Sequence, residues 1–321
     1  MGTMNKKIIT ALVALALALP ITANAAPKVN LKSTSASVPT IAILDTAIDM
    51  SQPKFQNSVV YEVCLIEIFF DSTPRCPNGL TSMEGPGAAT LSKDKLALGG
   101  FDHGTLMADQ ALQTNPNVKI VFIRIVGQRV GGIREHTNEA TVYNALQWVI
   151  NNQSKFNIQS VAMAQGSHSL GAAGTDYCPK TPTTVEKIKS LNALNVGVFF
   201  PAGNNSDYKR VSWPSCIPET ISMGATMPTG SIAFYSNYDA KLIDFYARGT
   251  TVLYGLDAKK TNFAGSSASV LVGATSWATI KSIKTTLSYT EIYDLISKTS
   301  KVTSSSRVGS GKLIDLAKAI G

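Results

Sequence analysis

Short apolar runs alternate along the chain with segments whose apolar residues recur at helical spacing. Runs of strand length predict strands at residues 40–45, 118–126, 160–163, 196–200 and 220–223. Helical periodicity predicts helices that begin at His103 and just after Ser267, and others at residues 139–152, 183–194, 291–297 and 313–320. Because strands alternate with helices of this length, the pattern predicts an α/β fold with a mostly parallel sheet covered by helices on both faces.

The N-terminus is typical of a secretory signal peptide. Lys6 and Lys7 precede an apolar stretch at residues 8–19, and Ala23-Asn24-Ala25 follows as a small-residue cleavage site. The apolar stretch is shorter than the roughly 20 residues that span a bilayer. The organisation that we expect is a signal peptide at 1–25, a short Ser-, Lys- and Thr-rich linker at 26–38, and one large domain at 39–321. The mature protein would be secreted or periplasmic.

Four cysteines in an exported chain predict disulfide bonds, because export leads to an oxidising compartment. Cys64 and Cys76 bracket a short polar loop, which favours local pairing. Cys178 and Cys216 would then pair with each other, although spacing alone leaves all three possible pairings open. Metal binding by the cysteines is not expected, because the sequence has no Cys-x-x-Cys motif and no paired-histidine spacing.

The chain is basic, but its charge is dispersed. The formal net charge is +8, and Lys6 and Lys7 of the predicted signal contribute to it. Outside the signal, adjacent basic residues occur only at Lys209-Arg210 and Lys259-Lys260. Nucleic-acid binding favours clustered positive charge interleaved with aromatic side chains. We therefore expect no nucleic-acid partner, and no membrane association once the signal is removed.

Three segments that are far apart each carry one member of a possible hydrolytic triad. Asp45 ends the first predicted strand, His103 opens a predicted helix, and the pair Ser266 and Ser267 opens another. The carboxyl ends of parallel strands lie at one edge of the sheet, so these residues could meet there. A histidine can take the proton of a serine hydroxyl, and a carboxylate fixes the imidazole tautomer.

Other residues could in principle take the same roles. Asp49 is the rival carboxylate, but it lies past the strand end and is expected to face solvent. His136 and His168 have no comparable setting and are expected to be structural. Asn204 follows an apolar strand and Gly203, whose lack of a Cβ permits close backbone approach. The Asn204 amide is therefore predicted to donate to the oxyanion of a tetrahedral intermediate.

These segments together resemble the subtilisin-like serine protease family, the subtilases. The resemblance extends over about residues 39–320. The similar segments are Asp45-Thr46-Ala47-Ile48-Asp49, His103-Gly104-Thr105-Leu106, Ala202-Gly203-Asn204, the run from Trp213 to Ala225, and Gly309-Ser310-Gly311-Lys312-Leu313-Ile314-Asp315. The order Asp, His, Ser is also that of the family.

The resemblance implies a doubly wound sheet and a serine endopeptidase that acts through an acyl-enzyme. It implies a polypeptide substrate bound as an extended strand beside Ala164, Gln165 and Gly166, with Gly203 also near the substrate. Secreted relatives place cysteines much as Cys178 and Cys216 are placed here, which favours that pairing and leaves Cys64 with Cys76. We expect a monomer. No cofactor is evident, although calcium is possible because family members often bind it through loop carbonyls.

The chain departs from the family pattern at several places. Ala47 and Leu106 replace a glycine and a histidine, Ala164-Gln165-Gly166 replaces Ser-Leu-Gly, and Val270-Leu271-Val272 replaces Ser-Pro-His. Between Asp45 and His103 the chain is longer than usual, and the Gly-, Pro- and Ser-rich stretch 74–100 predicts an irregular surface insertion.

Two alternative functions follow from these observations. Residues 26–38 are too few for the family's folding propeptide, so folding would proceed without it or with help in trans. Together with the motif departures, this leaves a catalytically impaired, subtilase-fold binding protein as the alternative. A convergent esterase would need a Gly-x-Ser-x-Gly elbow and the order Ser, Asp, His, and neither is present.

Two alignments select different serines as the nucleophile. Gly265-Ser266-Ser267 places Ser267 at the serine of the family's Gly-Thr-Ser, whereas counting back from Ala268-Ser269 selects Ser266. Close approach of a substrate carbonyl favours a residue without Cβ just before the helix-opening turn, which favours Ser267. Ser266 would then be a helix cap.

Overall fold

The computed structural model describes residues 37–67, 76–128, 133–134, 137–167, 178 and 182–321. They belong to one unit, Ser33–Gly321. The predicted signal peptide and most of the predicted linker lie outside the described residues, as do His136 and His168.

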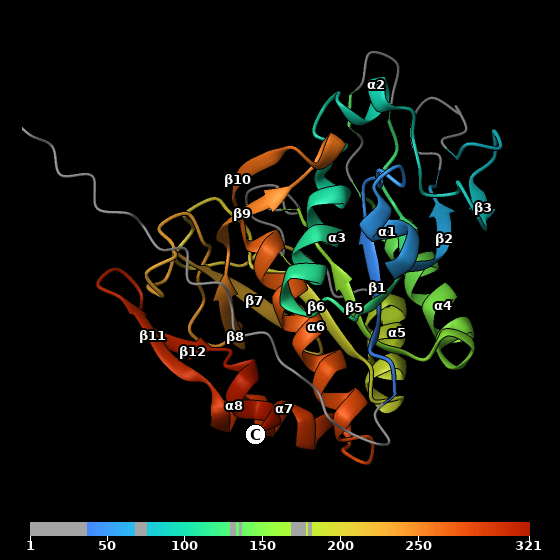
Figure 1. The fold of residues 1–321 in the computed structure, drawn as a ribbon. Helices are drawn as coiled ribbons and strands as arrows, with labels where there is room; N and C mark the ends of the chain where they lie inside the picture. The colour runs from blue at the N-terminus through green and yellow to red at the C-terminus, as the bar shows by residue number, and fades with distance from the viewer. Residues whose placement is uncertain (1–36, 68–75, 129–132, 135–136, 168–177, 179–181) are drawn as a thin grey trace, which may run out of the picture. The chain divides into compact units, whose positions relative to one another are not determined.

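Ten strands form one central sheet in the order β11-β12-β8-β7-β6-β5-β1-β4-β2-β3 (Figure 1). Neighbours pair in parallel from β2 to β12, and only the two edge strands, β3 and β11, pair antiparallel. The strands are β1 (Thr40–Asp45), β2 (Val59–Leu65), β3 (Ser82–Glu84), β4 (Lys119–Arg124), β5 (Ile158–Met163), β6 (Gly197–Pro201), β7 (Ile221–Thr226), β8 (Phe245–Arg248), β11 (Lys301–Ser305) and β12 (Gly309–Leu313). The predicted mostly parallel α/β sheet is confirmed.

Helices cover both faces of this sheet. On β1, Ile41 and Ile43 pack in one apolar cluster while Ala42 and Leu44 pack in another, because successive side chains of a strand point to opposite faces. The first cluster includes α3 (His103–Thr114), α6 (Ser266–Ile283), α7 (Tyr289–Thr299) and α8 (Leu316–Ile320). The second includes α4 (Glu139–Phe156) and α5 (Pro182–Ala193).

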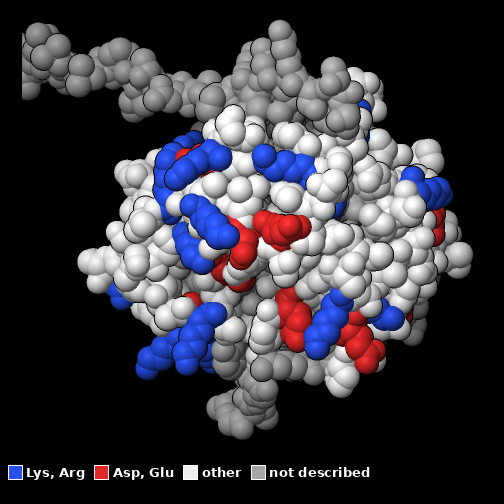
Figure 2. Space-filling view, turned by 90° about the horizontal axis from the view of Figure 1, so that it is seen from below, with Lys and Arg blue, Asp and Glu red and all other residues white. Residues whose placement is uncertain are grey.

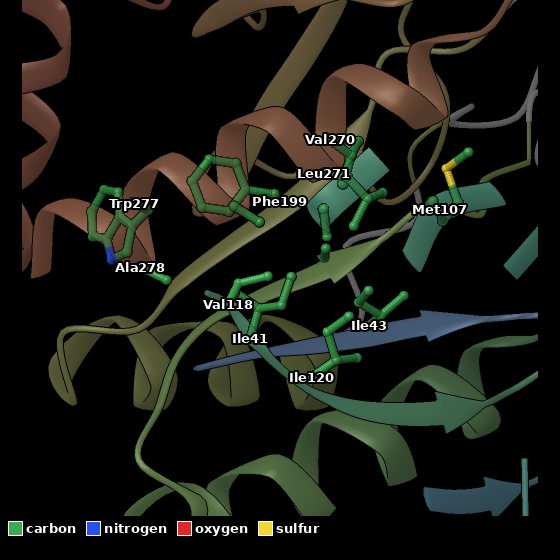
Figure 3. Packing of buried hydrophobic residues seen from close by; sticks show 14 of the residues in the cluster. Ile41, Ile43, Met107, Val118, Ile120, Phe199, Val270, Leu271, Trp277 and Ala278 are labelled. Carbon is green, nitrogen blue, oxygen red and sulfur yellow. The ribbon is translucent and has the colours of Figure 1, made fainter. Parts of the chain in front are cut away.

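Helix α6 runs through the centre of the first cluster (Figure 3). Val270, Leu271 and Trp277 of α6 are fully buried, and the Trp277 ring lies edge-on to Phe199 of β6 with ring centroids 5.9 Å apart. A helix that is apolar nearly all round is typical of a buried position, and each large side chain removed from water contributes roughly 1.5–3 kcal/mol. Burial of α6 therefore fixes where its N-terminal serines lie.

The sequence pattern missed the smaller elements and misplaced some ends. It missed α1 (Pro53–Ser58), α2 (Lys93–Leu96), η2 (Leu256–Ala258), β2, β3, β8, the hairpin β9 (Thr250–Tyr254) with β10 (Lys260–Ala264), β11 and β12. The last helix begins at Leu316 rather than near residue 313, because Leu313 pairs with Tyr246 of β8. Helix α5 begins at Pro182, one residue before the predicted start, and Thr184 inside it donates to Glu139 (3.0 Å).

Both predicted disulfide pairings are confirmed. Cys64 of β2 is bonded to Cys76, and Cys178 is bonded to Cys216. The first bond closes the loop that precedes β3, and the second joins the segment before α5 to the segment before β7. Each bond therefore restrains a segment that connects two elements of the fold.

The surface opposite the carboxyl ends of the strands carries mixed charge. Figure 2 shows Lys and Arg in separate groups with Asp and Glu between them. The described residues of this face form no continuous basic band of the kind that nucleic-acid binding favours. Among the helices of the described residues, none combines the length and the apolar character that crossing a membrane requires.

Removing either disulfide should lower the free energy of unfolding, and the loss should be larger for the bond that closes the longer loop. The sequence separations are 38 and 12 residues, so we expect losses of about 4 kcal/mol for Cys178→Ala/Cys216→Ala and about 3 kcal/mol for Cys64→Ala/Cys76→Ala. Denaturant unfolding under non-reducing conditions measures both. A larger loss for the shorter loop would contradict this expectation, and free thiols in the wild-type protein would contradict the pairings.

Candidate active site

Asp45 and His103 form a hydrogen-bonded pair at the carboxyl edge of the sheet. Asp45 is the last residue of β1, His103 is the first residue of α3, and His103 Nδ1 lies 2.8 Å from Asp45 Oδ1. The Asp45 side chain is fully buried and that of His103 is 16% exposed. The carboxylate therefore lies behind the imidazole, whose other edge is open to solvent.

Thr46 fastens the end of β1 to the start of α3. Its hydroxyl donates to the carbonyl of Phe101 (2.9 Å) and accepts the backbone N–H of Gly104 (2.9 Å). A Cβ at Gly104 would lie 2.5 Å from the Ala47 carbonyl oxygen and 2.7 Å from the Phe122 ring. Only glycine lets the helix start approach the strand end this closely.

The charge state of Asp45 is set by opposing effects. Burial favours the neutral acid, but attraction to His103, hydrogen bonds from His103 and from the Thr46 backbone, and the charge of Arg134 together lower the pKa of Asp45. The Asp45 carboxylate is thus ionised, and it can accept a hydrogen bond from the Nδ1 proton of His103.

The two serines at the start of α6 have different surroundings. Ser266 is fully buried; its hydroxyl donates to Asn204 Oδ1 (2.9 Å) and accepts the backbone N–H of Gly203 (3.1 Å). Ser267 is 8% exposed, and its hydroxyl donates to the carbonyl of Ala164 (3.0 Å). The expectation that Ser266 caps the helix is wrong, because Gly265 takes the N-cap position and the Ser266 hydroxyl bonds across to the loop after β6.

A pocket of about 470 Å³ opens at this edge of the sheet. It brings together nearly all the residues that the sequence singled out, and Asp45 lies buried beneath it. Its lining residues are His103, Arg134, Ala164, Gln165, Gly166, Ser167, Pro201, Gly203, Asn204, Asn205, Ser212, Phe263, Ala264, Ser266 and Ser267. Phe263 of β10 forms one wall, with its ring centroid 5.8 Å from that of His103.

Asn204 is oriented by Ser266. Its Oδ1 accepts from both the backbone N–H (2.8 Å) and the hydroxyl (2.9 Å) of Ser266. The preceding Gly203 has φ +107°, and a Cβ there would collide with the side chains of Ser212 and Asn237. Because the oxygen of the Asn204 amide is held in this way, its Nδ2 group is the end available as a donor.

The segment after β5 contains two contacts that sequence reasoning did not find. Gln165, expected only as a substrate-binding residue, donates from Nε2 to Asp45 Oδ1 (2.8 Å) and accepts from Arg134 at Oε1. In the sequence, the presence of Gln165 where the family has a leucine could have indicated a polar contact here. No feature of the sequence indicated the contact of Arg134, because nothing in its local sequence relates it to β5.

Asp49 does not face solvent as expected. It is 3% exposed, and its carboxylate accepts from Ser51, Gln52 and the backbone N–H of Asp257. It thereby fastens the turn after β1 to the segment after β9, and its role is structural.

The described residues include no group of three or more His, Cys, Asp or Glu side chains that could hold a metal ion. Calcium, which the family resemblance implies as possible, therefore has no carboxylate cage within these ranges. No step of the chemistry is assigned to it.

Comparison with known proteins shows the family and the fold. Residues 37–311 match the sequence model of the subtilase family, so the chain belongs to that family. An extracellular basic protease of Dichelobacter nodosus is 28% identical over 43% of this chain and 21% of its own length. A cuticle-degrading serine protease of Arthrobotrys oligospora is 25% identical over 67% of this chain and 44% of its own length. The chain thus matches less than half the length of these relatives.

Solved structures share the fold. A protease from Pseudoalteromonas arctica superposes with a TM-score of 0.70 at 18% identity, covering 89% of this chain and 91% of its own. The prenylagaramide maturation protease superposes with a TM-score of 0.63 at 15% identity, covering 89% and 94% respectively. The doubly wound, subtilisin-like architecture that the resemblance implied is therefore present.

Gly104→Ala should separate α3 from the end of β1, because the new methyl group meets a backbone carbonyl and a packed ring. We expect a loss of about 1–3 kcal/mol in unfolding free energy and loss of the downfield NMR signal of the His103 Nδ1 proton. Gly273→Ala is the matched control, since its methyl would meet the flexible Met223 side chain and the Phe199 ring, away from the site. A Gly104→Ala protein that keeps that proton signal would contradict the close-approach argument.

Proposed function

We propose that this protein is a secreted serine endopeptidase in which Ser267 is the nucleophile, His103 the general base and Asp45 the carboxylate that orients it. The observation that carries the proposal is the 2.8 Å Asp45–His103 hydrogen bond behind a pocket that Ser267 also lines. The Asp45–His103 hydrogen bond and the chain order Asp, His, Ser agree with the hydrolytic triad of the family, as do the positions of these residues at strand and helix ends.

The geometry supports an acyl-transfer mechanism. The described hydrogen bonds include none between His103 and a serine, so the Ser267 hydroxyl must first turn from the Ala164 carbonyl toward His103 Nε2. The imidazole then takes the hydroxyl proton at Nε2 while the oxygen attacks the substrate carbonyl. Nδ1 keeps its own proton, and the ionised Asp45 accepts the hydrogen bond from it and stabilises the imidazolium. His103 gives its proton to the leaving amine, and a water molecule hydrolyses the resulting ester by the same route.

Negative charge on the tetrahedral intermediate would meet two kinds of donor. The Asn204 amide donates from Nδ2, because its oxygen is held by Ser266. At the start of α6 the Ser267 backbone N–H is a further donor, whereas the N–H groups of Ser266 and Ala268 already donate to Asn204 Oδ1 and to the Gly265 carbonyl. Such preorganised donors are typically worth ~10²–10³ in turnover each.

Burial and bonding favour Ser267 over Ser266 as the nucleophile. The Ser266 hydroxyl is fully buried and engaged both as donor and as acceptor. Among the described residues, the Ser267 hydroxyl has one hydrogen-bond partner, the Ala164 carbonyl, and part of Ser267 is exposed at the pocket. Ser266 is instead suited to fix Asn204.

The substrate that we propose is a polypeptide in extended conformation. Ala164, Gln165 and Gly166 leave the carboxyl end of β5 and line the pocket beside Ser267. Export is supported by the predicted signal peptide, by two disulfide bonds and by the extracellular relative from Dichelobacter nodosus.

The alternative is an impaired subtilase-fold binding protein, and the bond from Ser267 to Ala164 rather than to His103 is the observation in its favour. Fluorophosphonate labelling decides between the two functions, because the reagent modifies only an activated serine. We expect labelling of the wild type on the peptide that contains Ser267. An unlabelled, correctly folded wild-type protein would favour the binding function.

The two serine variants form a matched pair. Ser267→Ala should abolish labelling and lower peptide cleavage by a factor on the order of 10⁴ or more. Ser266→Ala should keep labelling but slow cleavage by less than about 10³, because Asn204 loses one of its two anchors. Peptide mass spectrometry locates the label. Labelling that survives in Ser267→Ala and vanishes in Ser266→Ala would reverse the assignment.

Cleavage should rise with pH through about pH 6–8, because the base must be a neutral imidazole. His103→Ala should remove this activity while retaining the native circular dichroism spectrum. His136→Ala, which carries no assigned role, is the histidine control. Wild-type turnover in His103→Ala would refute the triad assignment.

A further inference from the structure

One side chain connects the buried carboxylate of Asp45 to an arginine at the pocket. Gln165 Nε2 donates to Asp45 Oδ1 at 2.8 Å, and Arg134 donates through its guanidinium to Gln165 Oε1. Gln165 is 7% exposed and Asp45 is fully buried, so this path is shielded from bulk water. A leucine, which the family has at this position, could make neither bond.

Gln165 shares its acceptor atom with the imidazole. Asp45 Oδ1 accepts from the Thr46 backbone (2.6 Å), from His103 Nδ1 (2.8 Å) and from Gln165, whereas Oδ2 has no partner among the described residues. Gln165 Nε2 lies 3.3 Å from His103 Nδ1. The two side chains therefore lie side by side on the same carboxylate oxygen.

This arrangement disfavours a protonated imidazole in two ways. A neutral donor on Oδ1 offsets part of the negative charge that would otherwise stabilise the imidazolium of His103. The positive charge of Arg134 repels that imidazolium, and low effective dielectric strengthens both effects in a buried site. Arg134 remains charged although burial lowers its pKa, because a guanidinium does not deprotonate in proteins.

The other charged groups around the pair are the same in the wild type and in the variants that are compared below. On β4, Arg124 is the register neighbour of Asp45 and is itself positive and buried. Asp102 precedes His103 at the start of α3, and Asp49 is engaged by Ser51 and Gln52. The described ends of β5 and α6 contribute only Gln165 and the two serines, and β10 contributes Phe263.

We propose that Gln165, held by Arg134, is a positioning residue that fixes Asp45 and keeps His103 available as a base at lower pH than the Asp45–His103 pair alone would allow. The proposal rests on the proposed function, because it assigns His103 the role of base. It predicts an enzyme whose activity extends further into acidic conditions than that of a variant with the family's leucine.

The test is the pH dependence of kcat/KM for cleavage of a short chromogenic peptide, which reports ionisation of the free enzyme. Gln165→Leu should raise the midpoint of the acidic limb by about half a pH unit or more, so that kcat/KM on that limb falls about threefold. Arg134→Met should raise the midpoint in the same direction. Both variants can change KM, but substrate affinity alone does not move this midpoint.

Gln159→Leu is the matched control. Gln159 is a buried glutamine at the start of β5, at the end of the strand opposite to Gln165, and it bonds Thr40 and Ser37. Its loss should lower stability and leave the midpoint unchanged. An equal rise in Gln159→Leu would show a general effect of losing a buried amide and would overturn the proposal.

A midpoint in Gln165→Leu that moves by less than about 0.2 unit, or falls, overturns the proposal. If that variant does not fold, an unchanged midpoint in Arg134→Met does the same. NMR titration of the His103 Cε1–H signal, identified by its loss in His103→Ala, repeats the comparison without catalysis. A wild type that neither cleaves peptide nor reacts with fluorophosphonate refutes the proposed function, while the imidazole titration still decides the role of Gln165.

Discussion

The buried carboxylate of Asp45 is the constraint around which this edge of the protein is arranged. A fully buried charge costs several kcal/mol unless hydrogen bonds and opposite charge compensate it. Compensation comes from the Thr46 backbone, His103 and Gln165, which belong to three different parts of the chain. The start of α3 and the end of β5 must therefore both lie against the end of β1. Gly104 permits the first of these approaches because it has no side chain.

Helix α6 supplies the second half of the arrangement. Its apolar residues fill the space between the sheet and α3, so its position is set by packing along its length (Figure 3). The helix start then places Ser266 and Ser267 opposite the loop after β6. Ser266 connects that loop to the helix through Gly203 and Asn204, while Ser267 remains at the pocket. One serine therefore ties the helix to the loop, and its neighbour lines the pocket.

The pocket is electrostatically simple. Among the described lining residues, Arg134 and His103 are the two that can carry charge, and the others are small, polar or aromatic. Because the negative partner, Asp45, is buried behind the imidazole, a bound peptide would meet hydrogen-bond donors and a positive edge rather than a carboxylate. This lining suits stabilisation of a developing oxyanion.

The sequence by itself determined the layered α/β fold, because strand and helix periods are local and the apolar runs are long. It also located Asp45, His103, the serine pair and Asn204, since each follows a strand or opens a helix. It failed for β8, which is only four residues long, and for the β9–β10 hairpin and β12, whose short strands are mostly not buried and carry little periodicity. It also misassigned Asp49 and the role of Ser266. Only the tertiary structure decided these contacts and the path from Arg134 through Gln165 to Asp45, because their partners lie far apart in the chain and meet only when the sheet is assembled.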